Sequence, residues 1–100
     1  FYSLWIFDHF MPFLFSKKKD YLEAWTTLSA LAAETSSIRL GTLVTCVSYR
    51  NPALLAKVAA TIDVLSGGRL EFGIGAGWYS FEYGAYGYPF PRAGVRLAQL

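Results

Sequence analysis

Three stretches of largely apolar residues recur along the chain without alternating with polar ones. They cover residues 3–7, 38–45 and 70–74. A short continuous apolar stretch predicts a strand that is buried on both faces, as in a parallel sheet. The β-branched residues of the second stretch favour the same assignment.

The segments between these stretches carry apolar residues at helical spacing. The first predicted helix takes Asp20 as its N-cap, with Glu23 three residues later in capping-box spacing, and ends near residue 35. The second takes Asn51 as its N-cap and Pro52 as its first residue. Glycine follows this helix at Gly67, where a C-cap needs positive φ.

Strands and helices thus alternate, up to a last helix that is expected to begin near Ala93. This alternation is typical of right-handed β-α-β units in an α/β fold with a parallel sheet. It fits an open doubly wound sheet or part of a (β/α)8 barrel, and three strands do not distinguish the two. The chain has 100 residues, of which 54% are hydrophobic, a high fraction for so small a domain. We therefore expect residues 1–100 to form one partial domain that is truncated at both ends.

Composition and charge exclude several classes of function. The net charge of +2 and a single basic run, at residues 17–19, predict no nucleic-acid partner. No apolar stretch approaches the roughly 20 residues that span a bilayer, so no membrane association is expected. One histidine, one cysteine and scattered acids predict no metal site. The single Cys46 suits a reducing compartment, and a cytoplasmic location is expected.

Polar and glycine-rich residues gather where the predicted strands end. In both architectures the carboxyl ends of parallel strands lie at one edge of the sheet, where ligands bind. His9 can change protonation near neutral pH, although a hydrogen-bonded histidine at a strand end explains it equally well. Asp8 is expected to orient its neighbours or to pair with an arginine. The residues that point to a site at this edge are Asp8, His9, Cys46, Gly73, Gly75, Gly77 and Trp78.

The sequence GIGAG at residues 73–77 is only loosely like a dinucleotide-binding fingerprint. That motif needs G-x-G-x-x-G after the first strand of the unit and a helix that opens at once. Here the glycines follow the third predicted strand and lead into a long loop rich in aromatic residues. Glycines in this place let a flat ligand approach the backbone closely.

Three segments of the chain match one known pattern in order. They are FDHFMP after the first strand, RNPALLAK with LSGGR and GIGAGW further on, and YGYPFP before the last helix. Together they resemble the bacterial luciferase-like superfamily, and more closely its coenzyme F420-dependent oxidoreductases. The resemblance implies a (β/α)8 barrel about three times as long as this chain. The chain would supply about strands two to four of that barrel and their helices.

The resemblance also implies roles for individual residues. His9 matches a histidine near the reactive face of the deazaflavin, where it would assist proton handling during hydride transfer. A non-prolyl cis peptide behind the cofactor ring would fall at Thr42–Leu43. Leu43 or Val44 would then press on the ring, and Thr45 would line the pocket. The expected cofactor-binding residues are Asp8, Thr42, Leu43, Val44, Thr45, Gly75 and Gly77.

Two departures from the family bear on the substrate. A branch that oxidises glucose 6-phosphate has a glutamate proton donor where this chain has Trp78, and a tryptophan where it has Phe13. The resemblance therefore does not carry the acid role over, and glucose 6-phosphate is a poor expectation. Phe13 and Trp78 are expected to line the substrate pocket instead. Glu82 is the nearest carboxylate, and nothing in the sequence shows that it replaces the missing acid.

The function expected from the sequence is that of a luciferase-like oxidoreductase, with F420-dependent hydride transfer to or from a small organic substrate. One alternative is an FMN-dependent monooxygenase that uses O2 on the same barrel. Another is a non-catalytic, flavin-binding barrel subunit, because a fold does not define an activity. The resemblance is compatible with a homodimer of the full-length protein. The 100 residues alone are expected to be inactive, because their outer strands lack pairing partners.

Overall fold

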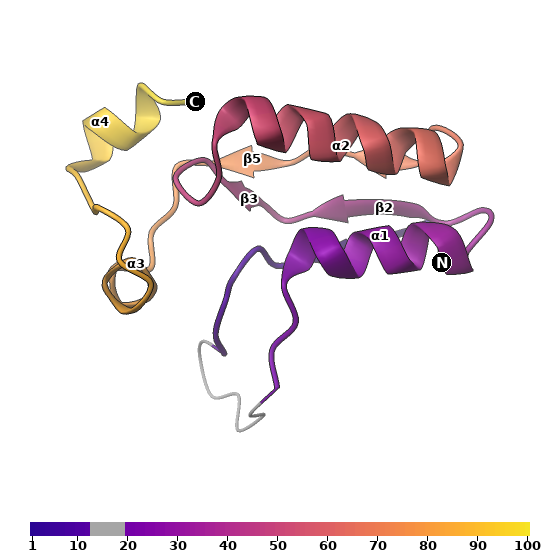
Figure 1. Cartoon of the computed structure of the whole chain (residues 1–100), viewed down its shortest axis with the longest axis horizontal. Coiled ribbons are helices and arrows are strands. Elements are labelled where there is room, and N and C mark those ends of the chain that lie inside the picture. Colours follow the sequence, from indigo (N-terminus) through magenta and orange to yellow (C-terminus); the bar gives the residue numbers. More distant parts are fainter. Residues whose placement is uncertain (13–19) are drawn as a thin grey trace.

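The computed structural model describes residues 1–12 and 20–100. It confirms the predicted alternation of strands and helices up to the third predicted strand, but a helix at residues 80–85 forms where the sequence predicted only a long loop (Figure 1). Five short strands and four helices follow one another in this part of the chain. The strands are β1 (Ser3–Ile6), β2 (Arg39–Thr42), β3 (Thr45–Cys46), β4 (Leu70–Glu71) and β5 (Ile74–Gly75), and the helices are α1 (Ala24–Glu34), α2 (Pro52–Ser66), α3 (Ser80–Ala85) and α4 (Ala93–Leu97).

All strand pairs are parallel, as the sequence predicted. One sheet has the order β1-β2-β4, and β3 pairs with β5 beyond its carboxyl edge. The second and third predicted strands are each divided in two. The amide of Leu43 still donates to the Ile6 carbonyl at 2.9 Å, and pairing resumes where the amide of Thr45 donates to Gly73 at 2.8 Å. A bulge at residues 43–44 therefore separates β2 from β3.

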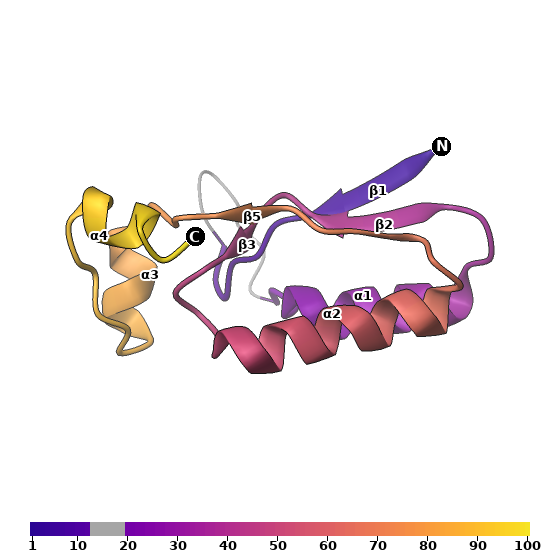
Figure 2. The ribbon, with the colours of Figure 1, turned by 90° about the horizontal axis from the view of Figure 1, so that it is seen from above.

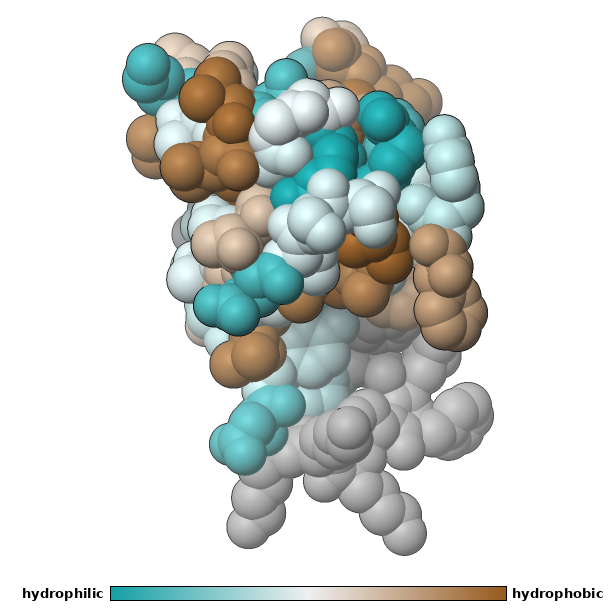
Figure 3. All heavy atoms as spheres, turned by 90° about the vertical axis from the view of Figure 1, so that its right-hand side faces the viewer, coloured by the Kyte–Doolittle hydropathy of each residue, from teal (hydrophilic) through white to brown (hydrophobic). Residues whose placement is uncertain are grey.

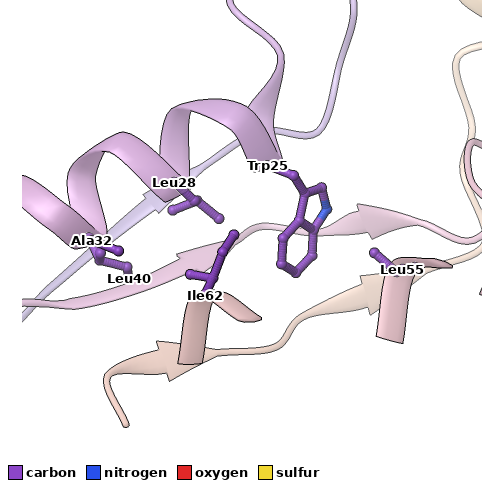
Figure 4. Packing of buried hydrophobic residues seen from close by; sticks show 6 residues of the cluster. All are labelled: Trp25, Leu28, Ala32, Leu40, Leu55 and Ile62. Atoms are coloured by element: carbon purple, nitrogen blue, oxygen red, sulfur yellow. The ribbon is translucent and has the colours of Figure 1, made fainter. Parts of the chain in front are cut away.

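Helices α1 and α2 lie side by side on the same face of the sheet (Figure 2). Their buried apolar side chains meet those of β2 in one cluster, which we call the apolar cluster (Figure 4). Side chains at spacings of three and four residues on α1 explain this packing, because they share one helix face. The buried members of the apolar cluster are Trp25, Leu28, Ala32, Leu40, Leu55 and Ile62.

The helix ends agree with the sequence prediction in four cases of five, including the end of α1 at Thr35 and the start of α4 at Ala93. The side chain of Asn51 accepts hydrogen bonds from the amides of Ala53 and Leu54, and Gly67 closes α2 with a φ of 70°. The expected N-cap of α1, Asp20, is wrong. Glu23 fills that position, and its carboxylate accepts from the first amides of the helix. Capping depends on where the chain enters the helix, and the preceding loop delays that point by three residues.

The sheet face opposite α1 and α2 carries apolar side chains that these helices do not cover. Trp5 and Leu43 are among the large hydrophobic residues exposed here. Figure 3 views the end of the molecule remote from α3 and α4 and shows apolar residues among polar ones on that surface. In the part of the chain that the structure describes, no helix is long and apolar enough to cross a membrane.

Candidate functional site

A cleft of about 360 Å³ lies where the carboxyl ends of three strands converge. It is lined by residues 7–9 after β1, by Leu43, Val44 and Cys46 around the bulge, by Tyr49, and by residues 75–78 after β5. The expected gathering of unusual residues at one sheet edge is therefore present. Parallel α/β folds bind their ligands at this edge.

The bulge between β2 and β3 presents two apolar side chains to the cleft. The non-prolyl cis peptide joins Leu43 to Val44, one residue later than the sequence resemblance implied. Leu43 and Val44 remain 54% and 42% exposed and line the cleft. A ligand in the cleft would meet these two apolar side chains.

Thr42 and Thr45 do not line the cleft, contrary to expectation. Both are fully buried, and their hydroxyl oxygens lie 2.5 Å apart in a hydrogen bond. The Thr42 hydroxyl also donates to the Gly73 carbonyl at 3.1 Å. Successive side chains of a strand point to opposite faces, and the bulge inverts this order between the two threonines. They support the bulge from behind.

Gly75 and Gly77, after the third predicted strand, lie where a side chain would clash with neighbouring side chains of the protein. A Cβ at Gly75 would lie 2.6 Å from Cγ2 of Val44. A Cβ at Gly77 would lie 2.1 Å from the Tyr83 hydroxyl, and its φ of 73° is unfavourable for other residues. Close approach by a ligand is therefore not needed to explain them, although both glycines line the cleft.

Asp8 is buried beneath the cleft and paired with an arginine, one of the two expectations for this residue. Both of its oxygens accept from the Arg50 guanidinium at 2.7 Å, and one also accepts from the Cys46 amide at 2.9 Å. Arg50 also donates to Glu23, the N-cap of α1. Burial works against the charge of Arg50, but Asp8 and Glu23 outweigh it and raise the pKa of the guanidinium.

Glu82 on α3 is the centre of a polar network behind His9. The Glu82 side chain is fully buried, and its Oε2 lies 2.8 Å from Nδ1 of His9. The same oxygen accepts from the Tyr49 hydroxyl at 2.5 Å. The other oxygen accepts from the amides of Phe10 and Met11, at 2.5 and 3.1 Å. The amides of Phe10 and Met11 and the Tyr49 hydroxyl donate to this carboxyl group, whereas the direction of its contact with Nδ1 of His9 depends on the tautomer of the ring.

Aromatic rings and hydroxyls surround this carboxylate. Cys46, Tyr49 and Tyr83 form a second buried cluster, which we call the polar-aromatic cluster and which also includes Glu82. Burial and the neighbouring Glu82 carboxylate raise the pKa of Tyr49. Burial and the hydrogen bond to Cys46 raise the pKa of Tyr83 to about 12. Burial also raises the pKa of the Cys46 thiol, which disfavours a thiolate nucleophile here.

His9 contacts two aromatic edges as well as Glu82. The ring centroids of Trp78 and Tyr79 lie 5.9 and 6.0 Å from that of His9, both in edge-on geometry. The His9 side chain is 12% exposed, and His9 and Trp78 both line the cleft. The histidine is therefore held from behind and reached from the cleft.

The structure brings most of the predicted site residues together and adds others. Phe13 lies outside the described residues. Three contributors were not assigned to the site from sequence: Arg50, Tyr49 and Tyr83. A signal for Glu82 existed, because an acid within a strongly aromatic segment needs buried partners. The predicted residues that share the cleft are Asp8, His9, Leu43, Val44, Cys46, Gly75, Gly77 and Trp78.

Within residues 1–12 and 20–100, the structure contains no group of three or more histidine, cysteine, aspartate or glutamate residues that could hold a metal ion. The Asp8 carboxylate and the Cys46 thiol, both in the lining of the cleft, are instead engaged in the hydrogen bonds described above. The arrangement suits an organic ligand with a flat apolar surface, with one titratable side chain at its edge.

Comparison with known proteins places the chain in a family. Residues 1–99 match the luciferase-like monooxygenase family, and the chain belongs to it. It is 34% identical over 100 residues to an F420-dependent glucose-6-phosphate dehydrogenase of Amycolatopsis mediterranei (strain U-32), covering 98% of this chain and 29% of that protein. The chain thus spans less than a third of the length of this relative.

Two solved structures share the fold. An F420-dependent secondary alcohol dehydrogenase in complex with an F420-acetone adduct superposes with a TM-score of 0.85 at 30% identity, over 99% of this chain and 30% of that one. Monooxygenase RslO1 from Streptomyces bottropensis superposes with a TM-score of 0.78 at 26% identity, over 98% and 29%. These matches confirm the fold class, part of a luciferase-like (β/α)8 barrel, and the resemblance to F420-dependent members.

Proposed function

We propose that this chain forms part of the F420 site of an oxidoreductase that transfers hydride to or from a small organic substrate. One observation carries the proposal: His9, Leu43, Val44 and Trp78 line a single cleft at the carboxyl ends of parallel strands. An apolar floor with a titratable group at its rim is what a flat redox cofactor requires. The F420-dependent relatives support the choice of cofactor.

The residues present fit such a group. Leu43 and Val44 offer exposed apolar surface beside the cleft, and Trp78 offers an exposed aromatic face. The deazaflavin, when bound, would accept or donate the hydride. His9 would move or hold the accompanying proton at the substrate, because imidazole changes protonation near neutral pH. Trp78 would shape the substrate pocket and exclude water, and Phe13 keeps its sequence-based assignment to the same pocket.

The substrate class proposed is a small alcohol or carbonyl compound. The secondary alcohol dehydrogenase that superposes on this chain was solved with an acetone adduct. Trp78 is a bulky apolar residue at the cleft, which suits a compact apolar substrate better than a sugar phosphate. The lone, buried Cys46 also supports work in a reducing compartment such as the cytoplasm.

A second candidate function is an FMN-dependent monooxygenase. The matched family is that of luciferase-like monooxygenases, and one superposed structure is a monooxygenase. Cofactor preference separates the two functions, because the monooxygenase reaction needs a flavin that reacts with O2.

The test is cofactor binding by the full-length protein, that is, the whole polypeptide in which these residues occur. F420 and FMN are titrated separately and followed by fluorescence quenching. F420 is expected to bind at least about tenfold more tightly, a difference of roughly 1.4 kcal/mol. Tighter binding of FMN would replace the proposal with the monooxygenase. Binding of neither cofactor would favour a non-catalytic barrel subunit.

Turnover of secondary alcohols with F420 then tests the role of His9. His9→Ala is expected to lower kcat by about 10²-fold or more and to leave the F420 dissociation constant within about threefold of the unmutated value. Lys57→Ala, at an exposed position of α2, is the matched control and should leave kcat unchanged. Unchanged turnover in the His9 variant would remove His9 from the mechanism.

A further inference from the structure

We infer that Glu82 is a positioning residue that fixes which nitrogen of His9 carries the proton. This inference rests on the proposed function only for its catalytic consequence, because the tautomer is a property of the protein alone. The two residues lie 73 positions apart in the chain, and Nδ1 of His9 lies 2.8 Å from Oε2 of Glu82. Glu82 stands on α3, outside the strand ends from which the site was predicted.

The direction of this hydrogen bond follows from the other contacts of the carboxylate. Oε1 accepts from two backbone amides, and Oε2 accepts from the Tyr49 hydroxyl. Nδ1 of His9 is then the one partner toward which a carboxyl proton could point without meeting a donor. A free carboxylic acid is a stronger acid than an imidazolium ion, so the proton of this contact is assigned to Nδ1 of His9. An ionised carboxylate only accepts, and Nδ1 of His9 therefore donates. In the neutral ring this leaves the lone pair on Nε2.

Burial makes this interaction strong and directional. The Glu82 side chain is fully buried and that of His9 is 12% exposed. Little water is available to replace either partner, and a hydrogen bond to a charged group in such surroundings is worth more than one at the surface. The edge contacts from Trp78 and Tyr79 restrict rotation of the ring further. Glu82 thus fixes Nε2 as the basic nitrogen of the neutral His9 ring.

The carboxylate also ties this orientation to the loop that carries the histidine. The amides of Phe10 and Met11 donate to the same Glu82 side chain that holds the His9 ring. Loop and ring therefore share one anchor.

The two kinds of donor respond differently to substitution, and this gives a sharp test. Backbone amides can only donate, whereas Nδ1 of histidine and a tyrosine hydroxyl can also accept. In Glu82→Gln, the side-chain carbonyl is expected to face the amides of Phe10 and Met11. Its NH2 group then faces Nδ1 of His9 and donates to it. The proton of the neutral imidazole must move to Nε2.

The experiment is 15N NMR of the full-length protein labelled at histidine, with the His9 signals identified by their loss in His9→Gln. The unmutated protein is expected to show neutral His9 protonated at Nδ1, and Glu82→Gln to show it protonated at Nε2. Tyr49→Phe removes one donor but keeps the carboxylate, so it should keep the Nδ1–H form. Tyr86→Phe is the matched control, because its hydroxyl contacts the Phe10 carbonyl and not Glu82.

An unmutated protein with His9 protonated at Nε2 would overturn the inference, even if no variant folds. An unchanged tautomer in folded Glu82→Gln would overturn it as well. A tautomer change in Tyr86→Phe would assign the effect to loosening of the loop and would also contradict it. None of these results depends on F420 binding, so failure of the inference and failure of the proposed function are distinguishable.

If Glu82 positions His9 for catalysis, its substitution should change kcat much more than the F420 dissociation constant. With F420 and a substrate that is turned over, Glu82→Gln is expected to lower kcat by about 10²-fold and to change the F420 dissociation constant by less than about threefold. Equal losses in both quantities would indicate a purely structural role for Glu82. The pH dependence of kcat should also change, because the proton acceptor at Nε2 is lost.

Discussion

The apolar cluster beneath the sheet and the polar-aromatic cluster beside the cleft are both buried, but they are built on different principles. Trp25, Leu28 and Ile62 meet through side chains that pack with little dependence on direction. In the polar-aromatic cluster Tyr49 hydrogen-bonds to Glu82, and Tyr83 hydrogen-bonds to Cys46. Each of these bonds needs a partner at a defined position. The first cluster holds the helices on the sheet, and the second holds a titratable group at the cleft.

The two clusters are expected to respond differently to amino-acid substitutions. In an apolar cluster the loss of stability grows with the side-chain volume that a substitution removes, because any apolar side chain that fills the space can stabilise the cluster. A buried polar network fails abruptly, because each missing partner leaves a polar atom unsatisfied. The cleft is therefore expected to be more sensitive than the helix pair to substitutions that change shape or charge only slightly. The helix pair is expected to be more sensitive to substitutions that remove side-chain volume.

The largest effect is expected from a deletion in the apolar cluster. Ile62 is 1% exposed, and Ile62→Ala should lower the free energy of unfolding by about 2–5 kcal/mol, since it removes packed methyl groups and leaves a cavity. Leu65→Ala on the same helix is the control, because Leu65 is 61% exposed, and it should change stability by less than about 0.5 kcal/mol. Urea denaturation of the full-length protein measures both. Equal losses of unfolding free energy in Ile62→Ala and Leu65→Ala would show that α2 does not pack against the sheet through Ile62.

A single added methyl group should damage the polar-aromatic cluster almost as much. In Gly77→Ala the new Cβ would lie 2.1 Å from the Tyr83 hydroxyl and 2.8 Å from Sγ of Cys46, at a φ of 73°. Backbone strain and loss of the hydrogen bond between Tyr83 and Cys46 should together lower the free energy of unfolding by about 2–4 kcal/mol.

Gly84→Ala is the control for this change, because its Cβ would meet nothing within 4 Å on α3. It should be neutral or stabilise the protein by up to about 1 kcal/mol, since alanine favours a helix. Thermal unfolding monitored by circular dichroism compares the two variants. A Gly77→Ala protein as stable as Gly84→Ala would contradict the tight contact with Tyr83.

The smallest effect concerns Glu23, which links the two regions by capping α1 and accepting from Arg50. Burial would raise the pKa of Glu23, but hydrogen bonds from Thr26 and Arg50 outweigh it and lower the pKa. A lowered pKa in the folded state means that this stabilisation is fully present above the ordinary value of 4.5 and is lost as pH falls through the folded value.

Comparison with Glu23→Gln measures this contribution. The difference in urea midpoint between the unmutated protein and the variant should be constant from pH 7 to about pH 5 and should shrink as the pH falls further. The effect is modest because the carboxylate is partly exposed. A difference that grows on acidification would mean that Glu23 is less acidic in the folded state than in the unfolded one.

Local patterns account for the parts of the fold that were predicted correctly. Asn51 and Gly67 mark the ends of α2 because caps act within a few residues of the helix terminus. The site edge was predicted from where strands end, and His9, Leu43 and Trp78 do share the cleft there. The family resemblance chose the barrel over the open sheet, and the superposed structures agree.

Other features required the folded chain. The register of the bulge turned Thr42 and Thr45 away from the cleft, and a shift of one residue exchanges the two faces of a strand. The start of α1 moved from Asp20 to Glu23 because the Glu23 carboxylate reaches the first amides of the helix and also meets Arg50. Neither outcome is visible in spacing alone.

By itself the sequence determined the order of strands and helices up to β5, the ends of α2 and the edge at which the site lies, because these depend on periodicity and on contacts between near neighbours. It did not predict α3, which forms in the segment expected to be a loop. Only the tertiary structure decided which partners the site residues take. Asp8 meets Arg50 across 42 positions and His9 meets Glu82 across 73. Such pairs form because the parallel strands bring their carboxyl ends together, and burial then makes each polar atom require the partner it finds there.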